Sequence, residues 1–219
     1  TTRQSLSVRT VCREYQTKKG GLKLTDNLIR GFEEFKNHYY GEDNSLMPKL
    51  VDEGQDPKYF IISCIDSRSN PGTIFSTKPG VFFAHKAMGA IVRPYKQGTA
   101  LSAALKFAID YNNVKTIVIL GHTQCGAVKA LCDGLQDEEI QSFIEFAQKA
   151  LAKAKTYSDN EQDMLEHTEK EVVLQSAENL KTYPSVKNAL DKGEVVIKPW
   201  LFDMAAGDLL EYDEEKQKF

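Results

Sequence analysis

The chain has 219 residues, 41% of them hydrophobic, and a formal net charge of -3 at pH 7. This length and hydrophobic content suit one globular domain with a sizeable core. The slightly acidic balance argues against nucleic acid as the main partner, because phosphate binding relies on clustered Lys and Arg. No apolar stretch approaches the roughly 20 residues that a membrane-spanning helix needs, so a membrane partner is not expected either.

The chain contains four cysteines, which do not resemble a disulfide scaffold at this length. In a reducing compartment, such cysteines more naturally bind a metal or take part in catalysis. The sequence therefore predicts a soluble protein of the cytoplasm or of an organelle interior. Because residue 1 is Thr rather than Met, the sequence does not exclude that an N-terminal targeting segment has been lost.

The first predicted element is an amphipathic helix over residues 25–40. Its apolar positions, among them Leu28, Ile29 and Phe32, recur every three to four residues, and Thr25 or Asp26 can cap its start.

Strand and helix patterns then alternate. Residues 59–64 are almost continuously apolar, as in a strand covered on both faces, and residues 81–85 form a second short strand. A helix over 99–111 leads to the clearest buried strand, 116–121, which a helix over 126–132 follows at once. This alternation predicts a parallel sheet with helices on both faces.

The remainder of the chain contains two longer helices and a return to strands. Residues 138–154 and 164–180 are predicted as surface helices, because Glu, Lys and Gln are frequent on their outer sides. Residues 195–197 and 200–202 predict a strand that ends in a hairpin-like turn.

The predicted fold class is α/β, with a mostly parallel central sheet flanked by helices. We expect a single domain over 1–219, made of an N-terminal helical arm (1–55), a core that carries the chemistry (56–135), a helical segment (136–193) and C-terminal strands (194–219).

Soft metal ligands follow two of the predicted strands. Cys64 ends the first apolar strand, and His122 ends the strand over 116–121, three residues before Cys125. Because ligands collect at the carboxyl ends of parallel strands, these side chains are expected to converge. Two thiolates and one imidazole would hold zinc and leave a fourth position for water or substrate, as in catalytic zinc sites. Cysteine is also a common core residue, and His-x-x-Cys alone is a weak pattern, so a structural role stays open at this point.

Asp66 and Arg68 stand next to the first cysteine. The planar guanidinium of Arg68 can hold Asp66 in one orientation and keep it ionised, so that Asp66 can exchange a proton with a bound water. The alternative for these two residues is a helix cap with a surface ion pair, which contributes little energy.

The pair of motifs, Cys64-x-Asp66-Ser67-Arg68 and Gly121-His122-x-x-Cys125-Gly126, resembles the β-class carbonic anhydrases. The resemblance extends through nearly the whole chain, from the N-terminal helix and the Gln55 segment to the closing strands around Trp200.

The resemblance implies one zinc ion per chain, with Cys64, His122 and Cys125 as ligands. It implies Asp66 and Arg68 as the catalytic pair, and Gln55, Phe83 and Gly126 as substrate-binding residues. The implied activity is that of a zinc lyase, the reversible hydration of carbon dioxide to bicarbonate and a proton, in a homodimer or larger homo-oligomer.

The chain departs from the family pattern at several positions, and two functions other than carbon dioxide hydration stay possible. Many members carry Arg-Asn and a later Asn after the second strand, where this chain reads Lys86-Ala87-Met88-Gly89-Ala90, and Phe107 stands where plant members have Tyr. Hydrolysis of carbonyl sulfide or carbon disulfide at the same site is one alternative. A non-catalytic protein that binds zinc or bicarbonate is the other, although a structural zinc would favour a fourth Cys or His ligand.

Overall fold

A computed structural model describes residues 25–41, 45–158 and 160–219. The chain divides into two compact units, residues 1–52 and 53–219. The first 24 residues of the predicted N-terminal arm lie outside the described residues. The expectation of a single domain over 1–219 stays a prediction.

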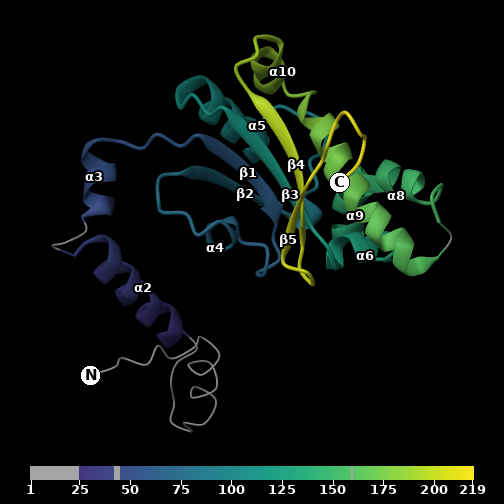
Figure 1. Cartoon of the computed structure of the whole chain (residues 1–219), viewed down its shortest axis with the longest axis horizontal. Coiled ribbons are helices and arrows are strands. Elements are labelled where there is room, and N and C mark those ends of the chain that lie inside the picture. The colour runs from purple at the N-terminus through teal and green to yellow at the C-terminus, as the bar shows by residue number, and fades with distance from the viewer. Residues whose placement is uncertain (1–24, 42–44, 159) are drawn as a thin grey trace, which may run out of the picture. The chain divides into compact units, whose positions relative to one another are not determined.

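The described part of the first unit consists of α2 (Asp26–Tyr39) and α3 (Leu46–Asp52) (Figure 1). Helix α2 confirms the helix predicted over 25–40, although the side chain of Thr25 makes no capping hydrogen bond. Its apolar side chains are exposed, with Leu28 at 75%, Ile29 at 59% and Phe32 at 57%. Within the described part of the first unit, the apolar face of α2 is therefore uncovered.

The second unit alternates strands with helices. Its strands are β1 (Tyr59–Cys64), β2 (Phe82–Ala87), β3 (Thr116–His122), β4 (Val196–Asp203) and β5 (Asp208–Glu211). Its α-helices are α4 (Pro71–Ile74), α5 (Ala100–Lys106), α6 (Gly126–Cys132), α7 (Glu138–Ile144), α8 (Gln148–Ala154), α9 (Glu161–Leu180) and α10 (Pro184–Asp191). Short 3-10 turns cover Met88–Ala90 and Glu145–Ala147, and a π-helical turn over Phe107–Tyr111 continues α5.

The strands form one five-stranded sheet in the order β2-β1-β3-β4-β5. Strand β1 pairs in parallel with β2 and β3, β3 pairs in parallel with β4, and β4 and β5 form an antiparallel hairpin (Figure 1). The predicted fold class, a mostly parallel central sheet flanked by helices with a C-terminal hairpin, is confirmed.

Strands β1 and β3 are buried on both faces, as their continuous apolar sequences predict. Alternate residues of these strands pack on one face against α5, α9 and α10. The intervening residues, Ile61, Val118 and Leu120, pack on the other face against Ile74, the last residue of α4, and against Trp200. This two-sided core fixes the strand ends from which the candidate site projects.

The helices differ from the sequence prediction in several places, and α3 and α4 were not predicted. Residues 138–154 are not one helix, because the 3-10 turn Glu145–Ala147 separates α7 from α8. Helix α9 begins earlier than predicted and is not a surface helix, since Val172, Val173 and Leu180 are buried against the sheet and the neighbouring helices. Helix α10, which starts with Pro184 in its first turn, was not predicted.

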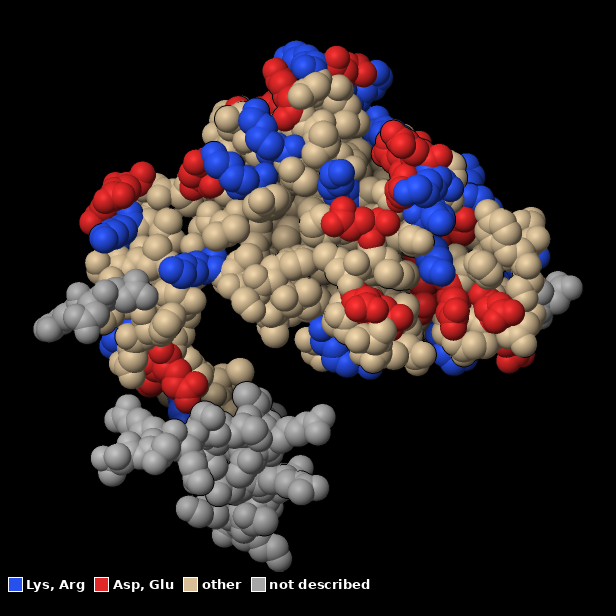
Figure 2. All heavy atoms as spheres, in the orientation of Figure 1, with Lys and Arg blue, Asp and Glu red and all other residues tan. Residues whose placement is uncertain are grey.

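Charged side chains of both signs are interspersed over the face of residues 53–219 that Figure 2 displays. None of the helices in the described residues is both long and apolar enough to cross a bilayer.

Candidate metal centre

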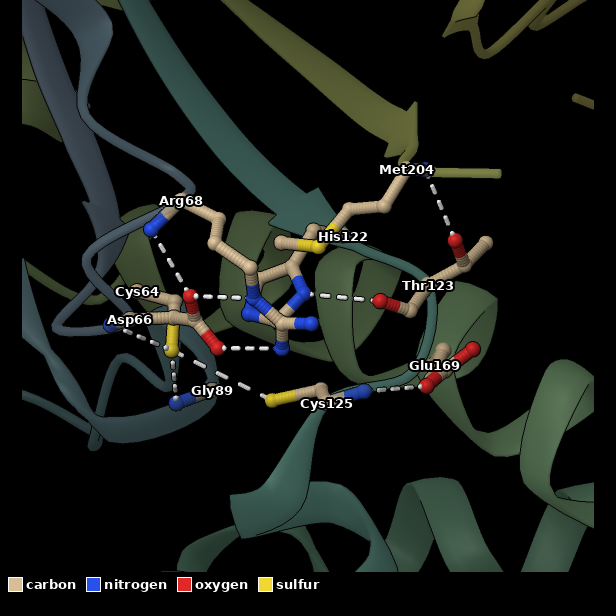
Figure 3. Close-up of polar contacts among 9 residues, drawn as sticks. All are labelled: Cys64, Asp66, Arg68, Gly89, His122, Thr123, Cys125, Glu169 and Met204. Carbon is tan, nitrogen blue, oxygen red and sulfur yellow. Dashed lines mark hydrogen bonds and ion pairs between the residues drawn. The ribbon is translucent and has the colours of Figure 1, made fainter. Parts of the chain in front are cut away.

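Cys64, His122 and Cys125 converge at the carboxyl edge of the sheet. Because β1 and β3 are adjacent and parallel, with Ser63 opposite Leu120, their last residues Cys64 and His122 end at the same edge. Cys125 immediately precedes α6 (Figure 3). The ligand atoms of the three side chains lie within 4.8 Å of one another, and each residue is at most 3% exposed.

The imidazole of His122 is oriented by its own backbone neighbour. Its Nδ1 lies 2.8 Å from the carbonyl oxygen of Thr123. A carbonyl only accepts hydrogen bonds, so Nδ1 carries the proton and Nε2 keeps a free lone pair. Nε2 is buried and has no hydrogen-bond partner among the described residues. An unpaired acceptor in such a place is what a metal ligand needs.

Cys64 and Cys125 share a hydrogen bond, and their sulfur atoms are 4.0 Å apart. Hydrogen bonding from Cys125, with help from His122 and the Asp66 backbone N–H, lowers the pKa of the Cys64 thiol to about 4 although burial opposes this. Hydrogen bonding to Cys64 and burial both raise the pKa of Cys125. The metal-free pair therefore holds one thiolate and one thiol.

This donor set fits zinc. Zinc bonds thiolate sulfur at about 2.3 Å in tetrahedral geometry, which places two such sulfurs about 3.8 Å apart. The observed 4.0 Å between the sulfurs is close to this separation. With three protein donors in the described residues, the group matches the ligand number of catalytic zinc sites rather than structural ones.

Asp66 is held beside this group by Arg68. Its Oδ1 accepts hydrogen bonds from the Arg68 backbone N–H at 2.8 Å and from Nε at 3.0 Å, and its Oδ2 pairs with an Arg68 terminal nitrogen at 2.8 Å. These bonds hold the pKa of the Asp66 carboxyl well below its usual range. Asp66 is therefore an oriented carboxylate at any ordinary pH (Figure 3).

Other groups support the loop that carries Cys64 and the Asp66/Arg68 pair. The backbone N–H groups of Asp66 and Gly89 donate to the Cys64 sulfur at 3.4 and 3.3 Å. The Lys86 ammonium donates to Ser63 Oγ at 3.1 Å and to the Ser69 carbonyl at 2.9 Å. Lys86 thus links the residue before Cys64 to the residue after Arg68.

Glu169, on α9, is a site residue that sequence reasoning missed. Its carboxylate accepts a hydrogen bond from the Cys125 backbone N–H at 2.8 Å, and the residue is 3% exposed. Burial raises its pKa to about 7, against the opposing effect of this hydrogen bond. A lone Glu in a charged helical sequence carries no signal of this contact, because only the fold brings α9 against Cys125.

The three predicted substrate-binding residues occupy different places. Gly126 begins α6 directly after Cys125. Phe83 pairs with Phe60 in the sheet, four residues before Cys64, which separates its backbone from Cys64 by about 13 Å along the strands. Gln55 is exposed. Within one chain, the sheet register therefore keeps Phe83 away from the Cys64 group.

Comparison with known proteins agrees with this geometry. A family model described as carbonic anhydrase matches residues 59–209. A carbonic anhydrase of Synechococcus elongatus is 31% identical over 191 residues, which cover 84% of this chain and 70% of the relative. Beta carbonic anhydrase 3 of Arabidopsis thaliana is 30% identical over 205 residues, which cover 88% of this chain and 79% of the relative.

Solved structures show the same fold. The β-carbonic anhydrase CcaA superimposes with a TM-score of 0.81 at 26% identity, over 90% of this chain and 98% of that one. A tetrameric β-carbonic anhydrase of Sordaria macrospora has a TM-score of 0.70 at 23% identity, over 93% of this chain and 96% of its own. The chain belongs to the carbonic anhydrase family, in its β class.

Proposed function

We propose that this chain catalyses the zinc-dependent reversible hydration of carbon dioxide to bicarbonate and a proton, which makes it a zinc lyase. Cys64, His122 and Cys125 hold one zinc ion per chain. The observation that carries the proposal is the convergence of these three buried donors beside an oriented carboxylate. Family membership supports carbon dioxide as the substrate.

The chain's residues divide the work as follows. When bound, zinc supplies Lewis acidity, which makes water nucleophilic at neutral pH. His122 keeps its Nδ1 proton on the Thr123 carbonyl and presents Nε2. Asp66, ionised and fixed by Arg68, accepts a hydrogen bond from the attacking water and orients it. The water oxygen bonds to the carbon of carbon dioxide, and the electron pair of one C=O π bond moves onto its oxygen. One O–H bond of the water breaks and its proton leaves to solvent, so bicarbonate forms without an oxidant or a reductant.

Arg68 has a second role, which is electrostatic. The two thiolates and Asp66 place three negative charges against one zinc ion, and the positive charge of Arg68 offsets the excess. The same charge favours bicarbonate, the anionic product, at the site.

We further propose that Gln55 and Phe83 serve the site of a second copy of the chain, whereas Gly126 serves its own site. The support is that Phe83 lies about 13 Å along the strands from Cys64 in the same chain. The Sordaria macrospora relative is described as tetrameric, which supports a homo-oligomer here. The compartment we propose is a reducing one, because Cys64 and Cys125 form no disulfide and must stay reduced to bind zinc.

The decisive experiment is stopped-flow hydration of carbon dioxide by purified protein, together with zinc quantitation. We expect about one zinc per chain and hydration at neutral and alkaline pH. Asp66→Asn should retain zinc and lose about 100-fold in kcat/KM, because the amide lacks the negative charge and replaces one acceptor oxygen with an NH2 donor.

Two outcomes would assign the site to another function. Zinc at about one per chain with turnover of carbonyl sulfide, and none of carbon dioxide, indicates the sulfur substrates. Bound zinc without turnover of either substrate indicates a non-catalytic zinc protein.

A further inference from the structure

Glu169 is a buried carboxyl group that the proposed reaction does not use. It lies on α9, contributes an acceptor to the Cys125 backbone N–H at 2.8 Å, and is 3% exposed (Figure 3). No Lys or Arg among residues 25–41, 45–158 and 160–219 forms an ion pair with it. Burying a carboxyl without a cation is costly, so its position needs a reason.

The segment that Glu169 contacts is the turn that delivers Cys125. Gln124 adopts a left-handed backbone conformation with φ of +58°, which is unfavourable for a residue other than Gly. Cys125 then occupies the N-cap position of α6, and its side chain makes no capping hydrogen bond. A residue at the N-cap has no intrahelical acceptor for its backbone N–H, and Glu169 supplies the acceptor for Cys125.

We propose that Glu169 is a positioning residue for the metal centre: by accepting the Cys125 N–H, it holds the Gln124–Cys125 turn so that the Cys125 sulfur meets Cys64 and His122. The inference deepens the proposed function and rests on zinc being held at this site. Groups that orient metal ligands from outside typically change metal affinity by about 10–100-fold when they are removed.

The hydrogen bond between Cys125 and Glu169 joins distant parts of the sequence. It links two residues 44 positions apart and couples α9, which packs against the sheet, to the loop after β3. A hydrogen-bond acceptor on this rigid helix restrains the ligand without occupying its sulfur. Because a Gln carbonyl can accept the same hydrogen bond, the role depends on the acceptor and not on the negative charge.

The test compares Glu169→Met, which keeps side-chain volume without an acceptor, with Glu169→Gln, which keeps an acceptor without the charge. Glu166→Met is the matched control, because Glu166 lies one turn earlier on α9 and is exposed. Zinc affinity is measured by competition with a chromophoric chelator. The thiolate-to-cobalt charge-transfer band of the Co²⁺-substituted protein reports the position of the sulfur ligands.

We expect Glu169→Met to bind zinc about 10–100-fold more weakly with an altered cobalt band. Glu169→Gln should restore most of the affinity and the wild-type band, and Glu166→Met should match the wild type. Wild-type affinity and spectrum in Glu169→Met would overturn the inference, and so would a Gln variant as weak as the Met variant. If Glu169→Met does not fold by circular dichroism, Glu169→Leu replaces it in the same comparison.

Failure of the proposed function has a different signature. A wild-type protein that binds neither zinc nor cobalt with its thiols refutes the proposed function before any variant is made. A wild-type protein that binds zinc and hydrates carbon dioxide, with an unaffected Glu169→Met variant, refutes only the role of Glu169.

Discussion

Two buried thiols 4.0 Å apart cannot both be anionic unless a cation lies between them. In the metal-free chain, the pKa of Cys64 is low and that of Cys125 is raised. Burial opposes the charge of His122, but Cys64 and Thr123 raise the pKa of the imidazole overall. Zinc binding must therefore displace the proton of Cys125, and at pH values below the raised pKa of His122 it must also displace an imidazolium proton.

We predict that zinc affinity falls as pH falls. The raised pKa values mean that Cys125 and His122 hold protons in the metal-free protein over a wider pH range than free side chains do, and zinc must compete with these protons. The check is calorimetry in buffers of different ionisation enthalpy near pH 7, which should show proton release on zinc binding. Affinity independent of pH between 6 and 8 would contradict this account.

The sequence predicts the site residues where metal-ligating side chains lie at the ends of predicted strands. Cys64, His122 and Cys125 could be predicted to converge because each lies at or just after the end of an apolar strand. Glu169 and Lys86 could not be predicted, because their roles depend on contacts that only the packed fold creates. The local sequences around them resemble ordinary charged surface.

At the scale of elements, the loop after β1 depends on a neighbouring strand. Ser63 and Ser69 are fully buried. The ammonium of Lys86, on β2, donates to the hydroxyl of Ser63 and to the backbone carbonyl of Ser69. This arrangement joins the two ends of the loop that carries Asp66 and Arg68.

Lys86→Met should loosen this loop. We expect an activity loss of at least about tenfold in kcat/KM, because small displacements of positioned groups are costly in catalysis. The free energy of unfolding should fall by about 1 kcal/mol from the lost hydrogen bonds. Lys187→Met is the control: its exposed ion pair with Asp191 should change stability by less than about 0.5 kcal/mol. Equal effects of the two substitutions on kcat/KM would exclude the role of Lys86.

Gly121 fixes how closely α9 approaches β3. A Cβ added there would lie 2.3 Å from the Val173 Cγ2, and a β-branched helical residue has little freedom to move away. Gly121→Ala should therefore destabilise the protein by about 1–3 kcal/mol in denaturant unfolding. Adding Val173→Ala should recover part of the loss, whereas Gly126→Ala, which meets no atom within 4 Å, serves as control. Unchanged stability of Gly121→Ala would show that the packing adjusts.

The strands were easier to predict than the helices. Continuous apolar runs in β1 and β3 reflect burial on both faces, a pattern with one interpretation. Helix α9 was misjudged because it buries polar residues, among them Glu169 and Glu171, beside Val172 and Val173. Its sequence therefore lacks the one-sided pattern by which a buried helix is normally recognised.

Among the described residues of the first unit, the apolar face of α2 has no cover. Leu28 and Phe32 are 75% and 57% exposed, which is unusual for large apolar side chains on one helical face. A subunit interface would cover this face, and the proposed use of Gln55 and Phe83 by a second copy requires such an interface.

We predict that the protein in solution has a mass that is a multiple of 24.6 kDa, as measured by light scattering. Combined Leu28→Glu and Phe32→Glu should lower this mass and reduce kcat/KM, because Gln55 and Phe83, which we propose to bind substrate, would lose the site of the second copy. Glu33→Gln, an exposed change on the same helix, should leave the mass unaltered. A wild-type monomer with full activity would remove the need for a second copy.

The proposed function depends on one zinc ion held by two sulfur donors and one nitrogen donor from β1, β3 and the residue that precedes α6. X-ray absorption at the zinc edge of the purified protein tests this claim most directly. The account predicts two sulfurs at about 2.3 Å and one imidazole nitrogen at about 2.0–2.1 Å, with a lighter atom completing the shell. A shell with no sulfur, or with three or more sulfurs, would contradict it.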